Sequence, residues 1–273
     1  MPTPDLKALL FDVDGTLADT ERDGHRVAFN LAFREAGLDW EWDVALYGKL
    51  LAVTGGKERI RYYLEQFNPG FSPPADRDAF IAGLHAAKTA HYTRLLAEGA
   101  IPLRPGVARL LREARDAGLR LAIATTTTPA NVTALIDHTL GHAALDWFEV
   151  IAAGDVVPAK KPAADIFLWA LERLGLPSEA CLAFEDSRNG ILAAHGARLP
   201  TLVTVNDYTR DDDFDDALLV LDQLGEPGAP FTVLGGRLGG LLDGQGDGIP
   251  HQGVVDTALL RALHVRHHRR QVA

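Results

Sequence analysis

The hydrophobic pattern of this chain starts with a short apolar run that ends abruptly in acidic residues. Ala8 to Phe11 are all apolar, which predicts a buried strand, and the sequence D-V-D-G-T-L follows at once. Like charges at the end of a buried strand are costly unless a cation or a reaction needs them. Side chains alternate along a strand, so Asp12 and Asp14 are expected to leave the same side, and Gly15 allows a bend. Taken alone, D-x-D favours a plain polar turn; the motifs further along the chain favour a functional site.

Residues 19–99 show helical spacing only. Helices are predicted over His25–Ala36, over Asp43–Leu50, from Gly56 toward Phe67, and over Asp76–Glu98. The breakers N-P-G and S-P-P separate the last two helices. Because no alternating strand pattern interrupts this block, it is predicted to form a small helical domain.

After residue 100, short apolar runs alternate with helical patterns. Strands are predicted over Leu121–Ala124, Val150–Ala153, Cys181–Phe184 and Leu202–Val205. Such alternation is typical of a parallel sheet covered by helices on both faces. The predicted fold class is therefore α/β, with a doubly wound parallel sheet formed by residues 1–18 and 100–273. The helical domain, residues 19–99, is inserted between the first two strands of that sheet.

The tail, residues 225–273, has a weaker pattern than the rest. Gly235–Gly248 is rich in glycine and is predicted to be a loop, and Val254–His264 fits a short strand followed by a helix. The basic sequence H-V-R-H-H-R-R at its end admits a metal site, but a frayed polar terminus is the favoured interpretation.

Composition narrows the classes of partner. The 273 residues include 27 Lys and Arg against 37 Asp and Glu, a net charge of −10, which argues against nucleic acid or an anionic membrane as a partner. The single cysteine, Cys181, permits no internal disulfide and lies in an apolar run, so a core position is expected. With no apolar signal segment and no apolar run long enough to cross a membrane, a cytoplasmic protein is expected. Composition does not determine the oligomeric state.

Polar residues follow the other predicted strands, and in a doubly wound sheet ligands bind at the carboxyl ends of the strands. The second strand ends in T-T-T-T-P-A-N, where the hydroxyl of Thr125 is suited to hold a phosphoryl oxygen. The alternative is that this segment caps a helix, and both roles are compatible, since a helix N-terminus also attracts anions. Thr126, Thr127 and Asn131 are weaker candidates for substrate contacts.

A lysine pair and a second acidic pair complete the set. Pro162 fits the first turn of a helix, where the preceding Lys161 gains nothing from the helix dipole, so an anionic partner such as Asp12 explains it. Lys161 is favoured over its neighbour because it precedes the proline; a solvated lysine pair is the alternative. Glu185 and Asp186 end the fourth strand, and with Asp12 they make an all-oxygen site that suits Mg²⁺.

These motifs, D-V-D-G-T-L, Thr125, K-P and E-D-S-x-x-G, resemble in type and order the four motifs of the haloacid dehalogenase (HAD) superfamily. The resemblance implies a HAD-like core with an inserted C1-type cap, and an aspartyl-phosphate intermediate formed on Asp12. It implies catalytic roles for Asp12, Asp14, Thr125 and Lys161. It also implies Mg²⁺ bound by the carboxylates of Asp12 and Asp186, by the carbonyl of Asp14, and by Glu185 directly or through water. Dehalogenases of the superfamily lack the acid found here as Asp14, so phosphoryl transfer is expected.

The helical block carries polar residues that packing does not require. Two glycines and two cations in T-G-G-K-E-R, which begins at Thr54, suit an anion at a helix start. Any one such residue is more often a surface residue, but their concentration predicts contacts with a second anionic group of the substrate. The candidates are Thr20, Glu21, His25, Gly55, Gly56, Lys57, Arg59 and Lys88.

Within the superfamily, residues 5–225 resemble the CbbY subfamily of phosphatases, which accompany Calvin-cycle carbon fixation. The resemblance is carried by D-T-E-R-D-G-H-R-x-A-F-N, V-T-G-G-K-E-R-I and A-K-K-P-A-A-D-I-F. It implies removal of the 1-phosphate of xylulose-1,5-bisphosphate, an inhibitor of Rubisco, so the expected partner is a small-molecule sugar bisphosphate. A sugar phosphomutase of the β-phosphoglucomutase type is the first alternative. A non-catalytic phospho-sugar binding protein and a structural module are weaker alternatives, because the motif residues are intact.

Overall fold

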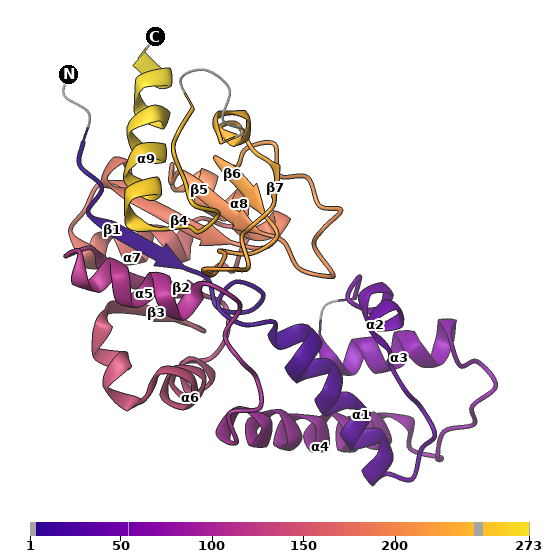
Figure 1. The fold of residues 1–273 in the computed structure, drawn as a ribbon. Helices are drawn as coiled ribbons and strands as arrows, with labels where there is room; N and C mark the ends of the chain where they lie inside the picture. Colours follow the sequence, from indigo (N-terminus) through magenta and orange to yellow (C-terminus); the bar gives the residue numbers. More distant parts are fainter. Residues whose placement is uncertain (1–3, 54, 243–247, 273) are drawn as a thin grey trace. The chain divides into compact units, whose positions relative to one another are not determined.

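The computed structural model describes residues 4–53, 55–242 and 248–272, and the chain divides into two compact units (Figure 1). The core unit consists of Met1–Asp19 and Pro102–Ala273, and the helical unit of Thr20–Ile101. The unit boundaries therefore follow Asp19 and Ile101, whereas the sequence pattern placed them after residues 18 and 99. In the described residues, none of the helices combines the length and the apolar character needed to cross a bilayer.

A seven-stranded sheet in the order β3-β2-β1-β4-β5-β6-β7 forms the centre of the core unit. Its strands are β1 (Ala8–Phe11), β2 (Arg120–Thr125), β3 (Phe148–Ala153), β4 (Cys181–Glu185), β5 (Thr201–Thr204), β6 (Leu219–Leu221) and β7 (Val233–Gly235). All neighbouring strands are parallel except β6 and β7, which are antiparallel. The predicted α/β class with a doubly wound parallel sheet is confirmed. β6 and β7 were not predicted, because three residues are too few to show a hydrophobic period.

Helices cover both faces of this sheet. The α-helices of the core unit are α5 (Val107–Asp116), α6 (Pro129–Leu140), α7 (Asp165–Leu174), α8 (Arg188–Gly196) and α9 (Thr257–Val272). Short 3₁₀ helices are η2 (His142–Trp147), η3 (Ser178–Ala180) and η4 (Gly239–Leu241). Leu10 of β1 packs in one buried cluster with Phe167 of α7 and Ala194 of α8. Leu9, the neighbour of Leu10, points to the other face, where α5 contacts β2 and α9 packs against α5. Cys181 is fully buried in this core, as predicted.

The tail differs from its prediction. Residues 248–256, the described segment directly before α9, contain no strand. α9 extends to Val272, so the basic sequence is helical rather than frayed. His264 and His268 are buried on the face that also carries Leu260, and His264 Nε2 is hydrogen-bonded to the Glu179 carbonyl at 2.7 Å. The frayed-terminus interpretation is wrong because a polar side chain that finds a backbone partner can be buried. Of the glycine-rich segment 235–248, residues 243–247 lie outside the described part, and η4 occupies part of the rest.

In the described part of the helical unit, which leaves out residue 54, the chain forms four α-helices and a preceding π-helix. They are η1 (Thr20–His25), α1 (Arg26–Glu35), α2 (Val44–Leu50), α3 (Gly56–Gln66) and α4 (Arg77–Ala97), which are the helices that the spacing predicted, apart from η1. Aromatic rings fill the centre: Trp42 lies 4.7 Å from Phe29 and 4.8 Å from Phe33 between ring centroids. The buried side chain of Asn30 bonds both backbone groups of Trp42, at 2.8 and 2.9 Å. The unit therefore has a hydrophobic core of its own.

Candidate active site

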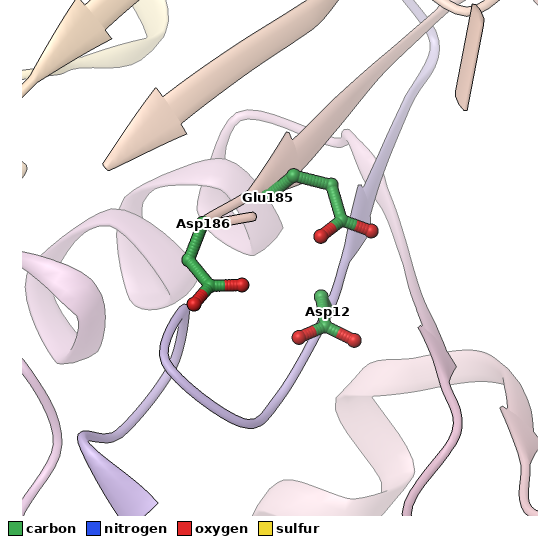
Figure 2. Close-up of side chains that lie close together, drawn as sticks. All are labelled: Asp12, Glu185 and Asp186. Atoms are coloured by element: carbon green, nitrogen blue, oxygen red, sulfur yellow. The ribbon is translucent and has the colours of Figure 1, made fainter. Parts of the chain in front are cut away.

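The parallel pairing of β1 with β4 brings Asp12 beside Glu185. Phe11 lies opposite Phe184 in the register, and the Asp12 amide donates a hydrogen bond of 3.0 Å to the Phe184 carbonyl. Asp186 follows Glu185 directly. Figure 2 shows the carboxylates of Asp12, Glu185 and Asp186 pointing toward a common space. The three residues are only 6%, 1% and 7% exposed, so the strand register gathers acids from distant parts of the chain in a buried cluster.

Lys161 lies between two of these carboxylates. Its Nζ donates to Asp12 Oδ1 at 2.6 Å and to Glu185 Oε1 at 2.5 Å, and all three side chains are buried. The neighbouring Lys160 pairs instead with the exposed carboxylate of Asp155, at 2.6 Å. Of the two lysines, Lys161 is therefore the one that contacts the acidic cluster.

The local backbone at Lys161 differs from the sequence prediction. Pro162 was expected in the first turn of a helix, but α7 begins only at Asp165, and Lys161 lies in the turn before it. The peptide bond between Lys161 and Pro162 is cis. The helix-start interpretation is wrong because Lys161 lies outside the helix. Contacts with the carboxylates of Asp12 and Glu185 position its ammonium group instead.

Burial and crowding shift the pKa values of these groups. Burial raises the pKa of Glu185 to about 8; Lys161 opposes this rise and Asp12 adds to it. Burial, followed by the charges of Asp12 and Glu185, raises the pKa of Asp186. Burial alone would lower the pKa of Lys161, but the two carboxylates beside it outweigh burial and raise it. The charges of Lys161 and Arg104 oppose the rise in the pKa of Asp186 but do not cancel it, so a further cation would stabilise the ionised cluster.

The acidic cluster has the donor set of a hard divalent cation such as Mg²⁺. One carboxylate oxygen from each of Asp12, Glu185 and Asp186 lies within 4.8 Å of the others. Glu185 Oε2 is buried and accepts no hydrogen bond within the described residues. A set made only of oxygen donors, one of them buried without a proton donor, fits Mg²⁺.

The turn after β1 passes close to the acidic cluster. Gly15 has a φ of 84°, and a Cβ at this position would collide with the carboxylate of Asp186. Glycine is therefore needed for two reasons, the left-handed backbone and the close approach. Asp14, which is half-buried, immediately precedes Gly15 and lies two residues after Asp12.

Two polar residues that sequence reasoning missed support this turn and the acidic cluster. Asn206 Nδ2 donates to Asp186 Oδ2 at 2.7 Å. Its position after the strand predicted over Leu202–Val205 was the available clue. The guanidinium of Arg104 is buried and offered no clue, because it lies far from any predicted strand end. It donates to the carbonyl oxygens of Gly15, Thr204, Val205 and Asp222.

Thr125 ends β2 and is fully buried. Because Phe11 lies opposite Ile123 in the register, Thr125 is level with Val13, beside the turn that follows β1. The hydroxyl therefore lies at the same sheet edge as the acidic cluster, which is where the sequence predicted it.

The residues after Thr125 serve the start of α6. Thr128 is the N-cap and accepts from the Asn131 amide, so the cap is not Thr125. The Asn131 side chain donates to Thr127 Oγ1 at 3.1 Å, and Thr126 is exposed. Their roles as substrate contacts stay predictions.

In the helical unit, a hydrogen-bonded chain joins Glu21, Tyr47 and Arg59. The Tyr47 hydroxyl donates to Glu21 Oε2 at 2.6 Å, and Arg59 donates to the Tyr47 hydroxyl at 2.7 Å. Burial would raise the pKa of Glu21, but the charges of His25 and Arg59 outweigh it and lower the pKa. Glu21 is therefore held as a carboxylate, and part of the charge of Arg59 is already compensated.

His25 and Lys88 form the second half of this cluster. Lys88 Nζ and His25 Nδ1 are 2.8 Å apart, and the His25 ring stacks on Tyr92 at 3.9 Å between centroids. Burial, followed by the opposing charge of Glu21 and the added charge of Lys88, lowers the pKa of His25 to about 4. At neutral pH, His25 is therefore a neutral imidazole that accepts a hydrogen bond from the ammonium of Lys88.

The other predicted residues of the helical unit are less closely associated. Thr20 is buried, whereas Lys57 and Gly55 are exposed and Gly56 is half-buried. Thr54, which begins the glycine-containing segment, lies outside the described residues. The structure thus brings together four of the eight predicted candidates: Glu21, His25, Arg59 and Lys88.

The order of the strands, the acids at their carboxyl ends and the lysine between them are the features of one hydrolase family. The sequence model of the haloacid dehalogenase-like hydrolases matches residues 6–198. The chain belongs to this family, as the motifs predicted.

Among its relatives, the chain is similar to the CbbY proteins. It is 51% identical over 229 residues to the plasmid-encoded CbbY of Cupriavidus necator. The aligned region covers 83% of this chain and 89% of that protein. The chain is also similar to CbbY from Rhodobacter sphaeroides, whose crystal structure was solved in complex with phosphate. The two share 48% sequence identity and a TM-score of 0.67, and the match covers 86% of this chain and 98% of the other. A mutant of the same protein was solved in complex with xylulose-1,5-bisphosphate. The predicted membership and the enzyme class, a HAD-type phosphatase, are confirmed.

Proposed function

We propose that this enzyme is a Mg²⁺-dependent phosphatase that removes the 1-phosphate of xylulose-1,5-bisphosphate. Membership of the HAD-like hydrolase family and similarity to the CbbY proteins support a sugar-phosphate phosphatase of the HAD type. The observation that carries the proposal is the buried contact of Asp12 with Lys161 beside two further carboxylates, Glu185 and Asp186. The choice of sugar is supported by the CbbY mutant solved with this bisphosphate.

In the proposed reaction, Asp12 is the nucleophile. One of its carboxylate oxygens attacks the phosphorus, the bond to the sugar oxygen breaks, and an aspartyl-phosphate forms. Asp14 gives its proton to the leaving alcohol and later takes a proton from the water that hydrolyses the intermediate. Lys161 offsets the repulsion between Asp12 and the phosphate, and the Thr125 hydroxyl donates to a phosphoryl oxygen.

The proposed Mg²⁺ site uses the carboxylates of Asp12 and Asp186 and the carbonyl of Asp14. Glu185 joins them directly or through a water molecule. When bound, Mg²⁺ neutralises negative charge on the phosphoryl group. The buried, unbonded oxygen of Glu185 and the raised pKa of Asp186 support a cation at this place.

The helical unit is proposed to bind the second phosphate of the substrate. Its cations Lys57, Arg59 and Lys88, with the neutral imidazole of His25, are suited to an anionic group. The remaining proposed contacts are Thr20, Glu21, Gly55 and Gly56 in this unit, and Thr126, Thr127 and Asn131 in the core unit.

The experiment that tests the reaction is a phosphate-release screen over sugar phosphates, with Mg²⁺ and with a chelator. We expect phosphate release only when Mg²⁺ is present. The release should require no added sugar-bisphosphate activator, whereas a mutase would need one. The Asp12→Asn variant should abolish turnover, while Asp211→Asn, which changes an exposed aspartate, should not. Appreciable residual activity in purified Asp12→Asn would refute the nucleophile assignment.

The substrate class is tested by comparing kcat/KM for sugar bisphosphates and monophosphates. We expect a preference for bisphosphates that Lys57→Ala reduces, while Lys49→Ala, which removes another exposed lysine of the helical unit, leaves it intact. Equal efficiency on both substrate types, unchanged in Lys57→Ala, contradicts the proposal.

This activity would protect Rubisco by removing one of its inhibitors. We also propose that the enzyme acts in the cytoplasm, as its sequence pattern predicts. The direct check is to inhibit Rubisco with xylulose-1,5-bisphosphate and add the enzyme. Carboxylation should recover with the wild type and stay inhibited with Asp12→Asn.

A further inference from the structure

A polar pocket lies in the core unit at the amino ends of β4 and β5, the sheet edge opposite to the acidic cluster. Its volume is about 330 Å³. Segments from three parts of the chain form it: η3 before β4, the turn between α8 and β5, and the tail with α9. Its titratable lining residues are Glu179, His195, Arg198, Arg237, His267 and His268.

The charge of this pocket is opposite to that of the protein. Two arginines and three histidines face one carboxylate, in a chain whose net charge is −10. The side chains of Arg198 and Arg237 are exposed, whereas His267 and His268 are each only 8% exposed. The guanidinium groups stay charged at all relevant pH values, so the pocket attracts anions.

The buried imidazole of His268 is held in position by its neighbour His264. His264 Nε2 bonds the Glu179 carbonyl at 2.7 Å, and His268 Nε2 lies 3.2 Å from His264 Nε2. The helix that carries these imidazoles, α9, is joined to α5 at its start, where the Thr257 amide donates to Glu113 at 2.8 Å. Burial and then the charges of His268 and Arg237 lower the pKa of His267 to about 4. The two guanidinium groups outnumber the single carboxylate of Glu179, and the neutral ring of His267 adds a polar group to the lining, a combination that favours an anion.

We propose that this pocket is a second, non-catalytic anion site that binds the phosphate group of a small phosphorylated molecule. The planar fork of an arginine matches phosphate oxygens in a bidentate contact, and imidazole N–H groups add directed donors. The volume is within the range of small-ligand pockets. A divalent metal is the wrong ligand, because the two guanidinium groups would repel it.

The site joins residues of the tail to residues of the matched region, and it contains none of the four motifs. The family match ends at residue 198, so Arg237, His267 and His268 lie beyond it. The proposal does not depend on the reaction proposed above, since none of the pocket residues belongs to the acidic cluster or to the helical unit.

The experiment follows the ring signals of His267 and His268 by NMR during titration with inorganic phosphate, each assigned with a His→Asn variant. We expect both signals to shift with phosphate and not with potassium chloride of equal ionic strength, which controls for screening. A second titration with glucose 6-phosphate uses the Asp12→Asn background, so that the ester is not consumed. A shift with both probes supports a site for phosphorylated molecules, whereas a shift with inorganic phosphate alone would contradict it.

The double variant Arg198→Gln/Arg237→Gln should weaken this binding by about tenfold or more. The matched control is Arg112→Gln/Arg173→Gln, which removes two exposed arginines elsewhere in the core unit and should bind as the wild type does. Thermal unfolding and kcat should be unchanged in both, which separates the pocket from the catalytic reaction. Histidine signals that do not move with either phosphate probe, or an equal loss of binding in the control, would overturn the proposal.

Discussion

The buried ammonium of Lys161 compensates negative charge in the acidic cluster. It contacts Asp12 and Glu185 at 2.6 and 2.5 Å, and all three side chains are buried. In such a site, removing one partner leaves the other charges without compensation, which costs more than the pair itself contributes. The same residue therefore affects both folding and the proposed nucleophilic attack.

Replacing Lys161 by Met should lower kcat by about 10²–10³-fold, because the attack of Asp12 on phosphate loses its nearest positive charge. The free energy of unfolding should also fall, by about 3–5 kcal/mol in the absence of Mg²⁺. Urea titration and phosphate release check the two effects. Lys160→Met is the matched control, since Lys160 pairs with the exposed Asp155; a comparable loss there would contradict the assignment.

Residues of the acidic cluster differ in how far sequence could predict them. Asp12, Glu185 and Asp186 stand out because a charge at the end of an apolar run is unusual. Arg104 and Asn206 do not, because arginine and asparagine are common in loops and only the folded chain brings them to Gly15 and Asp186. A residue whose role depends on where its neighbours lie leaves no pattern in the sequence.

At the scale of the element, the turn after β1 determines how closely the backbone approaches the acidic cluster. Gly15 is left-handed and in contact with Asp186. Gly37, after α1, is also left-handed, with a φ of 71°, but a Cβ there would meet nothing within 4 Å. Comparing these two positions therefore separates the effect of backbone strain from the effect of a steric collision with Asp186.

Gly15→Ala should destabilise the core unit by about 1–3 kcal/mol and abolish most activity, because the new methyl displaces the Asp186 carboxylate. Gly37→Ala should cost about 1–2 kcal/mol through backbone strain alone and keep full kcat. Unfolding free energies and kcat of the two variants check this. Equal kcat in both would show that the approach to Asp186 does not matter.

The helical unit contains a histidine whose burial affects stability as a function of pH. The pKa of His25 falls from 6.5 to about 4 on folding, so the unfolded chain binds the extra proton between these values. The contribution of neutral His25 to the free energy of unfolding is therefore fully present above pH 6.5 and is lost as the pH falls toward 4. By pH 5 the loss should reach about 2 kcal/mol.

Hydrogen exchange of α1 and α4 amides near neutral pH and at about pH 5 measures this loss. In His25→Gln, the loss of stability of the helical unit over this pH window should be smaller by the same amount, because glutamine does not titrate. A slope identical to that of the wild type would contradict the assignment of the lowered pKa to His25. His138→Gln, which changes a histidine of the core unit, is the control.

At the scale of the whole molecule, the C-terminal helix is part of the core unit although it lies beyond the family match. α9 buries Leu259, Leu260 and Leu263, and Arg261 donates to the Leu6 carbonyl at 3.3 Å. The tail thus contacts the segment that leads into β1, and its removal would expose apolar surface on that side.

Leu260→Ala should lower the free energy of unfolding by about 2–5 kcal/mol, the usual cost of a cavity in a packed core. Leu168→Ala, on the surface of α7 with 51% of the residue exposed, should change it by less than about 0.5 kcal/mol. Urea unfolding of both variants checks the contrast. A value for Leu260→Ala as small as that of the control would show that α9 packs only loosely.

By itself, the sequence determined the class of fold, the inserted helical block and the acids and lysine that carry the proposed chemistry. These features are local: periodicity reports which face of an element is buried, and a charge that interrupts an apolar run is visible without any neighbour. Only the tertiary structure decided that Arg104 and Asn206 hold the turn after β1 and Asp186. It also decided that the basic tail becomes a helix whose buried histidines line a pocket. Those outcomes depend on which distant backbone groups satisfy a polar side chain, and no short window of sequence contains both partners.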